Sequence, residues 1–447
     1  MGREGGNSRI LVFALLVFGV LLARNSLAEE TFFYVEKPAG GRIYVFHSMT
    51  VYNRWSRTGE IENPIVRPEA GPAGETLVFD SNAAIHLYNF KHDLPGEILP
   101  ADEPARKGKP AFTYDWKDGK TRLEGEHAKL EISNRIQIRL TDNIPEAGQA
   151  QDSFRIRRAK TKFEGWIYGK SLTYKLQMNW ADSSNQELED ALLDYDVTRG
   201  REAFHIKAGQ FKAPFGRQEL TSSGKQQFVD RSIVSERFVK GRDIGLQFWG
   251  QTPHHMLEWQ TGIFNGNGRN KTSNDNDELQ FDARVNFQPF GDVKYSESDF
   301  ESHDRPLLAI AAQFEKNNMT DSDPTTDRSD LTTWGGDIVF KFKGLSVFAE
   351  YFRQDIVPEA GKAFDADGIN GQIGYFIYRR HVEIALRYAT LDPSDLVTGD
   401  DRRERGLAVN WFIHAHALKL QADYRQLKDD AIDSTVYEAR LQMQFIF

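Results

Sequence analysis

Basic side chains are concentrated in one stretch of an otherwise acidic chain. The 447 residues carry a formal net charge of -9, yet residues 212–243 hold seven basic side chains and four acidic ones. Guanidinium groups bind oxyanions through paired hydrogen bonds, and an ammonium group acts as a mobile point charge. Neighbouring segments add further basic residues at polar positions. The candidate anion-binding residues are Arg158, Lys160, Lys162, Lys175, Lys207, Lys212, Arg231, Arg237, Lys240 and Arg242.

The elements that must position these residues are strands with alternating apolar and polar side chains. In residues 129–140, Leu130, Ile132 and Ile136 share one face, and the charged side chains share the other. Strict alternation is typical of a strand with one wet face and one apolar face. Sixteen segments show this pattern. They are residues 129–140, 153–168, 171–180, 189–198, 203–212, 242–251, 255–265, 278–290, 306–316, 331–342, 345–355, 366–378, 381–391, 403–413, 416–427 and 434–447.

The connections between these segments mostly alternate in length, and the chain ends on an aromatic residue, Phe447. Long polar connections such as 265–277 alternate with tight ones such as 343–344, and 291–305 is the clear exception. Long loops on one side and short turns on the other are typical of a barrel in the outer membrane, where closure leaves no open sheet edge. The sequence therefore predicts an all-β fold, a 16-stranded antiparallel transmembrane β-barrel. A soluble β-sandwich is the weaker alternative.

The N-terminal part of the chain is organised differently. Residues 1–28 contain arginines before an apolar run that is too short to span a bilayer as a helix, and small residues follow it. This pattern predicts a secretory signal peptide. Residues 29–125 are interrupted by proline and glycine, and we expect a periplasmic extension and linker there, either a small domain or a loosely ordered arm. Residues 126–447 would form the barrel.

Three stretches resemble the phosphate-selective porin O and P family. They are residues 152–180, residues 205–215 with the run Gly-Gln-Phe-Lys-x-Pro-Phe, and residues 229–246. With the C-terminal phenylalanine, the resemblance covers about residues 112–447. It implies a sixteen-stranded barrel that assembles as a trimer in the outer membrane, with a long third loop folded into the pore. The strand count made from the alternation gives the same number.

A barrel of sixteen strands is wide enough for an aqueous channel, whose function depends on the charges at its constriction. With residues 212–243 as the constriction, the basic residues above would pass small anions, with phosphate or polyphosphate as candidates. The alternatives are a general or cation-preferring diffusion porin, and a structural barrel plugged by residues 29–110. In a channel with mixed charges, Asp190, Asp194 and Asp196 would neutralise the basic second strand.

Composition and the absence of certain motifs in the sequence argue against several other functions and partners. The acidic balance argues against nucleic acid as a partner. A nucleophile-elbow motif is not apparent, so we do not expect an enzyme, and we predict no cofactor or metal site. The expected partners are small anions, outer-membrane lipid, lipopolysaccharide and further copies of the chain in a homotrimer. The expected location is the outer membrane of a Gram-negative-type bacterium, with the N-terminal segment in the periplasm.

Overall fold

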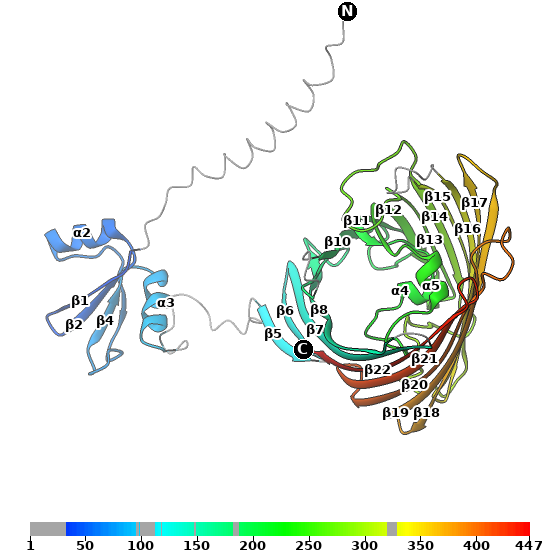
Figure 1. The fold of residues 1–447 in the computed structure, drawn as a ribbon. Coiled ribbons are helices and arrows are strands. Elements are labelled where there is room, and N and C mark those ends of the chain that lie inside the picture. Colours follow the sequence, from blue (N-terminus) through cyan, green and yellow to red (C-terminus); the bar gives the residue numbers. More distant parts are fainter. Residues whose placement is uncertain are drawn as a thin grey trace, which may run out of the picture. The chain divides into compact units, whose positions relative to one another are not determined.

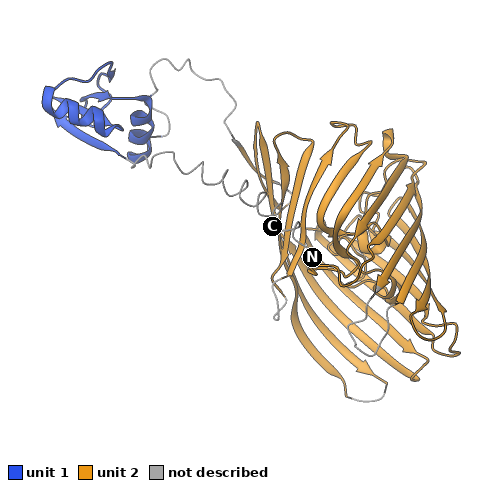
Figure 2. Cartoon of the chain, turned by 90° about the horizontal axis from the view of Figure 1, so that it is seen from above, with its two compact units in different colours: residues 1–109 blue, residues 110–447 orange. Residues whose placement is uncertain are grey.

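The computed structural model describes residues 33–94, 98, 112–117, 119–146, 149–181, 187–319 and 329–447. The chain divides into two compact units, residues 1–109 and residues 110–447 (Figure 2). The predicted signal peptide, residues 1–28, lies outside the described residues, as does most of the proline-rich linker. Among the residues that are described, no helix is long and apolar enough to cross a membrane.

The first unit contains a small four-stranded sheet with two helices. Its strands follow the order β1-β2-β4-β3, and β2 and β4 run parallel. The elements are β1 (Val35–Ala39), β2 (Arg42–Phe46), α2 (Met49–Thr58), β3 (Ile65–Arg67), β4 (Thr76–Phe79) and α3 (Asn82–Lys91). Val45, Leu77 and Phe79 of the sheet pack against Ile85 and Tyr88 of α3, and all five are buried. The described part of this unit is therefore a folded domain with its own core.

The second unit contains the barrel. Its sixteen described strands β7–β22 are antiparallel, each pairs with the next, and β22 pairs with β7 to close the ring. The strands are β7 (Ala128–Pro145), β8 (Gln151–Ile167), β9 (Leu172–Asn179), β10 (Glu187–Asp196), β11 (His205–Lys212), β12 (Arg242–Gln251), β13 (Leu257–Phe264), β14 (Gln280–Phe287), β15 (Leu307–Met319), β16 (Ser329–Phe342), β17 (Leu345–Pro358), β18 (Phe364–Tyr378), β19 (Val382–Asp392), β20 (Arg402–His414), β21 (Leu418–Asp429) and β22 (Ser434–Ile446), with a 3-10 turn η1 (Pro253–His255) before β13. The predicted fold class is confirmed.

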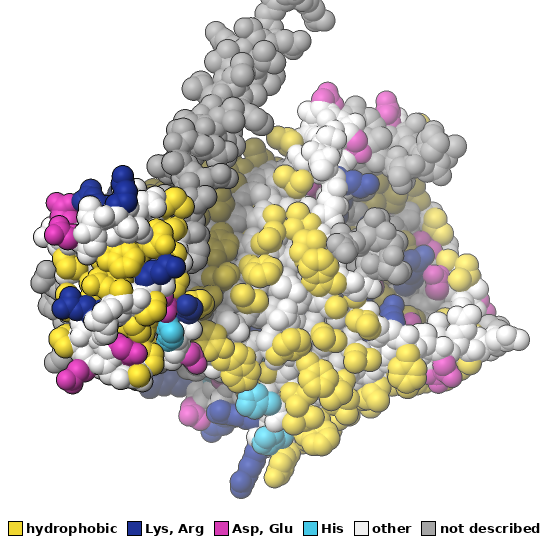
Figure 3. Space-filling view, turned by 90° about the vertical axis from the view of Figure 1, so that its left-hand side faces the viewer, with side chains coloured by type: hydrophobic (Ala, Val, Ile, Leu, Met, Phe, Trp, Pro, Cys, Tyr) yellow, Lys and Arg dark blue, Asp and Glu magenta, His cyan; other side chains and the backbone are white. Residues whose placement is uncertain are grey.

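The distribution of side chains on the barrel wall is the reverse of that in a soluble protein. Ile369 and Leu386 are exposed on the outside, and hydrophobic side chains are spread over the part of the wall seen in Figure 3. Gln372, Arg387 and Asn410 point inward and are buried. In a lipid bilayer the outer wall must be apolar, so the alternation read from the sequence separates a lipid face from a lumen face.

A hairpin precedes the first barrel strand. β5 (Phe112–Lys117) pairs with β6 (Lys120–Gly125), and β6 pairs with the first residues of β7. β5 and β6 therefore belong to the barrel sheet, and the second unit begins at residue 110. We expected the barrel to begin at residue 126, and the hairpin before it was not predicted, because its alternation is too short to be distinguished from the irregular sequence before it.

Candidate functional site

The connection between β11 and β12, residues 213–241, folds into the barrel, and we call it the inward loop. It contains two short helices, α4 (Arg217–Leu220) and α5 (Ile233–Phe238), which lie inside the ring of strands in Figure 1. Val234 and Phe238 of α5 pack against Phe352 of β17 and Ala389 of β19. The inward loop thus crosses the lumen and is fastened to the opposite wall, as expected for the third loop.

A single carboxylate fixes the middle of the inward loop. Asp230 accepts hydrogen bonds from Arg139 of β7 at 2.6 and 3.1 Å, from Arg440 of β22 at 3.3 Å and from Arg157 of β8 at 3.4 Å. Arg158 lies 3.9 Å away. Burial favours the neutral acid, but the hydrogen bonds and charges of Arg139 and its neighbours hold the pKa of Asp230 well below its usual range.

A second segment enters the lumen from the opposite end of the barrel. It is the connection between β14 and β15, residues 288–306, which we call the long turn. The carboxylate of Glu297 accepts hydrogen bonds from the Gln227 backbone N–H at 2.7 Å and from the amides of Gln372 and Gln218 at 2.9 and 3.0 Å. The sequence showed that this connection is unusually long, but we did not predict that it folds inward.

The inward loop and the long turn together fill one side of the lumen. On β14, β17 and β19, the inward-facing Arg284, Glu350 and Glu383 are at most 1% exposed. Gln227 of the inward loop and Ser298 of the long turn both donate to Glu383. Side chains buried to this degree do not form a water-filled wall. A large open space lies beside β7–β13.

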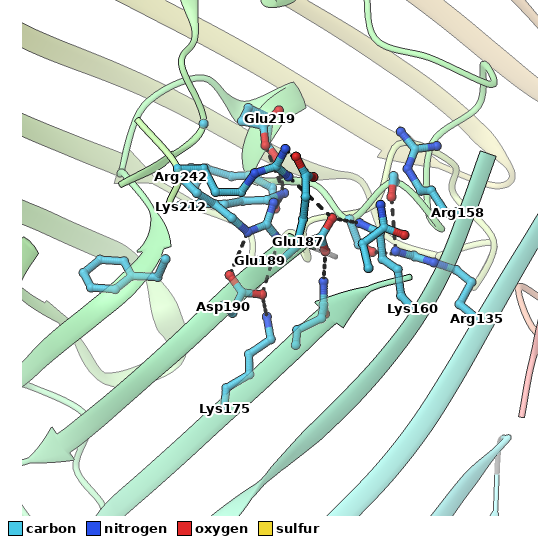
Figure 4. Close-up of a pocket in the computed structure, with 18 of the residues that line it drawn as sticks. Arg135, Arg158, Lys160, Lys175, Glu187, Glu189, Asp190, Lys212, Glu219 and Arg242 are labelled. Carbon is cyan, nitrogen blue, oxygen red and sulfur yellow. Dashed lines mark hydrogen bonds and ion pairs between the residues drawn. The ribbon is translucent and has the colours of Figure 1, made fainter. Parts of the chain in front are cut away.

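That space is a cavity of about 880 Å³ between the inward loop and the strands from β7 to β13. The side chains that line it are strongly basic, with twelve arginines and lysines and four carboxylates (Figure 4). The basic residues are Arg135, Arg155, Arg157, Arg158, Lys160, Lys175, Lys207, Lys212, Arg231, Lys240, Arg242 and Arg269. The acidic ones are Glu187, Glu189, Asp190 and Glu219. We refer to this space as the basic cavity.

Eight of the ten residues predicted from the sequence line the basic cavity. The two that do not are Lys162 and Arg237. Lys162 forms an ion pair with Glu164 on its own strand. Arg237 extends from α5 and donates a 3.1 Å hydrogen bond to Gln354 of β17.

The carboxylates compensate part of the positive charge. Asp190 accepts a 2.9 Å hydrogen bond from Arg242 of β12 and forms a 2.8 Å ion pair with Lys175 of β9. Glu189 pairs with Lys160 of β8. In the alternative of a channel with mixed charges, Asp190, Asp194 and Asp196 would neutralise the second barrel strand, β8, whereas in the structure the partner of Lys160 on that strand is Glu189.

On the inward loop, Glu219 forms a 2.7 Å ion pair with Arg231. Burial alone would raise the pKa of Glu219, but Arg231 and Lys212 hold it below the usual range. Asp194 contacts His205 and Lys207 of β11. The basic residues that form ion pairs with carboxylates therefore lie mainly on the β9–β12 side of the cavity.

Two arginines of the cavity, Arg135 and Arg155, are not neutralised by a carboxylate partner among the described residues. Arg135 of β7 donates to the hydroxyl groups of Ser222 and Ser223 at 3.1 and 3.2 Å. Neither Arg135 nor Arg155 forms an ion pair with any carboxylate that the structure describes. An arginine held by neutral hydroxyl groups retains its full attraction for an oxyanion.

Two charged residues of the cavity were missed because bulges move them onto the lumen face. The register of β8 against β7 shifts beside Gln137, which makes Arg157 an extra residue. The register of β10 against β9 shifts between Leu188 and Asp190, and the extra residue is Glu189. A bulge turns two consecutive side chains toward one face, so simple alternation cannot predict them. Arg135, in contrast, follows the alternation and could have been included.

The model of the phosphate-selective porin O and P family matches residues 131–447, which is more than half of the chain. The chain belongs to this family. Membership, together with the closed barrel, makes this porin an outer-membrane channel. The match begins inside β7, so it leaves out the first unit and the β5–β6 hairpin.

Individual proteins resemble this porin more distantly. An uncharacterized protein of Aquifex aeolicus (strain VF5) is 24% identical over 376 residues, which cover 72% of this chain and 88% of that protein. The solved anion-selective porin from Comamonas acidovorans is 8% identical, with a TM-score of 0.55, over 72% of this chain and all of the other. The outer membrane channel DcaP of Acinetobacter baumannii is 10% identical, with a TM-score of 0.51, over 72% and 98%. At these identities the two structures establish the shared barrel fold.

Proposed function

We propose that this porin passes small anions by passive diffusion through the basic cavity, with phosphate and polyphosphate as the candidate solutes. The observation that carries the proposal is the excess of basic over acidic side chains around the basic cavity. Anions would be concentrated there because fixed positive charges between low-dielectric walls raise the local potential. The solved porin from Comamonas acidovorans, whose fold is similar, is described as anion-selective.

The arrangement of charges suits transit better than tight capture. Arg242 and Lys160 are partly compensated by Asp190 and Glu189, whereas Arg135 and Arg155 are not. An ion that moves along the wall would therefore meet several sites of moderate strength, which permits both entry and exit. The four carboxylates favour the second candidate, a general diffusion porin with little selectivity, and measurement of selectivity separates the two.

The proposal includes an orientation and an assembly. The short turns and the first unit would face the periplasm, and the long loops would face the exterior, where their acidic residues would bind lipopolysaccharide through divalent cations. A homotrimer is the assembly that we infer from the family. A barrel plugged by residues 29–110 remains an alternative, and that barrel would not conduct.

Ion selectivity tests the proposal directly. We expect purified mature protein in a planar bilayer to show a reversal potential directed toward chloride under a KCl gradient. Added phosphate should reduce the chloride current, because both anions would occupy the same guanidinium groups. A reversal potential directed toward potassium would contradict the anion channel, and an absence of conductance would support the plugged barrel.

Arg135 should contribute to selectivity without holding the fold together. A unit charge about 7 Å from an ion in water favours an anion by about 0.6 kcal/mol and disfavours a cation by about the same amount, so Arg135→Gln should lower the ratio of anion to cation permeability about sevenfold. Folding should be unaffected, because the partners that lose Arg135 are serine hydroxyl groups and not carboxylates. Lys362→Gln, in an exposed connection away from the cavity, is the matched control and should leave the ratio unchanged.

A further inference from the structure

Three carboxylates converge beneath the connection between β13 and β14, residues 265–279, at the end of the barrel that carries the long loops. They are Asp243 of β12, Asp282 of β14 and Glu315 of β15, and each is at most 3% exposed. Asp282 and Glu315 are direct cross-strand neighbours. The amide of Gln280 lies between them and donates to Asp282 Oδ2 at 2.8 Å and to Glu315 Oε2 at 3.3 Å. Two acidic groups therefore share a single donor.

Several oxygen atoms around this pair have no hydrogen-bond partner. Asp282 Oδ1, Glu315 Oε1, Gln280 Oε1 and Asn317 Oδ1 are all buried, and no donor within the described residues reaches them. A buried acceptor without a donor costs free energy, so a group of four requires an explanation. Carboxylate and amide oxygens are the ligands that Ca²⁺ and other hard divalent cations prefer.

The charge of the cluster also calls for a cation. Asp243 accepts hydrogen bonds from the backbone N–H groups of Gly266 at 2.8 Å and Gly268 at 3.0 Å, so its charge is partly satisfied. Lys240 is the cation that acts on Asp282 and Glu315, and it donates to the Gly266 carbonyl at 3.1 Å. One ammonium group faces three carboxylates, and a bound divalent cation would neutralise the negative charge that is left.

We propose that Asp282, Glu315, Gln280 and Asn317 bind a hard divalent cation of the Ca²⁺ type. The described residues contain no group of three His, Cys, Asp or Glu side chains suited to a metal ion, so this site depends on amide carbonyls as well as carboxylates. The cation completes the attachment of residues 265–279 to the wall. That connection is already bonded to Asp243 through Gly266, and to Asn317, whose amide donates to the Gly266 carbonyl at 3.1 Å.

Calcium titration of the folded, chelator-treated protein in detergent tests the site. Isothermal titration calorimetry should detect saturable Ca²⁺ binding, and Ca²⁺ should raise the unfolding temperature relative to excess EDTA, because it binds only the folded state. In the Asp282→Asn, Glu315→Gln double variant, affinity at this site should fall about 100-fold or more, and the shift in unfolding temperature should disappear. Circular dichroism establishes that the variant is folded.

The controls separate this site from surface binding. Asp355→Asn removes a carboxylate of β17 whose side chain is 44% exposed, and it should leave both the affinity and the temperature shift unchanged. Equal Ca²⁺ binding by the double variant would overturn the proposal and assign the ion to the exposed acidic loops. An absence of Ca²⁺ binding by the wild-type protein, with a higher unfolding temperature in the double variant, would also overturn it. That result would identify Asp282 and Glu315 as a carboxyl pair that shares a proton.

Discussion

Asp230→Asn is expected to destabilise the barrel by about 3–5 kcal/mol and to release the inward loop from its position. Arg139 is fully buried and directs three hydrogen bonds to residues 229 and 230, two of them to the Asp230 carboxylate. Arg440 and Arg157 approach the same carboxylate. Loss of one partner from a buried ion pair leaves an uncompensated buried charge, and this is the origin of the large cost. The denaturant midpoint and the single-channel current noise measure the two effects.

Asp433→Asn is the control, because it makes the same chemical change in an exposed connection between β21 and β22. It should alter neither the midpoint nor the noise. The wild-type contact should also persist in acid. Because the pKa of Asp230 is lowered in the folded state, its stabilisation is present above the pKa of the unfolded chain, about 3.9, and is lost only below that value. An equal midpoint for Asp230→Asn and wild type would contradict the proposed anchoring.

Glu297→Ala is expected to loosen the long turn and to widen the open part of the lumen. Its carboxylate joins the long turn to Gln218 and Gln227 of the inward loop and to Gln372 of β18. Three hydrogen bonds to a charged acceptor would be lost, which should cost about 3 kcal/mol or more. Conductance should rise, because space now filled beside β14–β20 becomes accessible to ions. Single-channel recordings and thermal unfolding measure both consequences.

Glu301→Ala, an exposed carboxylate of the same long turn, provides the comparison. It should leave conductance and unfolding temperature close to the wild-type values. If Glu297→Ala lowers stability but leaves conductance unchanged, the long turn has a structural role only and does not limit the channel.

The strands could be predicted from the sequence because the bilayer imposes a strict division between two faces. Residues such as Leu386 and Arg387 alternate between lipid and lumen, and the alternation marks nearly the whole length of each strand. The inward loop was predicted from its length, its basic charge and the family resemblance. Its attachment was not, because the pairing of Asp230 with Arg139 and Arg440 joins residues that are 91 and 210 positions apart in the chain.

The other features that were not predicted share one cause. Their positions depend on the three-dimensional arrangement of strands, which leaves no pattern in the neighbouring sequence. Arg157 and Glu189 reach the cavity through register shifts that depend on the neighbouring strand. The inward path of the long turn depends on partners such as Lys341, which donates to the carbonyl groups of Ser296 and Ser298. In each case the residues are visible in the sequence, but their positions are fixed by strands that lie far away along the chain.

The arrangement at the seam of the barrel has a consequence for its diameter. β22 pairs with residues 135–145 of β7, Phe447 exchanges two backbone hydrogen bonds with Asn134, and β6 pairs with residues 129–132 immediately below. The last strand cannot slide further along β7, because the hairpin already holds those hydrogen-bonding positions. Since the stagger at closure and the strand number together determine the radius of a barrel, this short hairpin limits the radius by blocking a shift of the last strand in that direction.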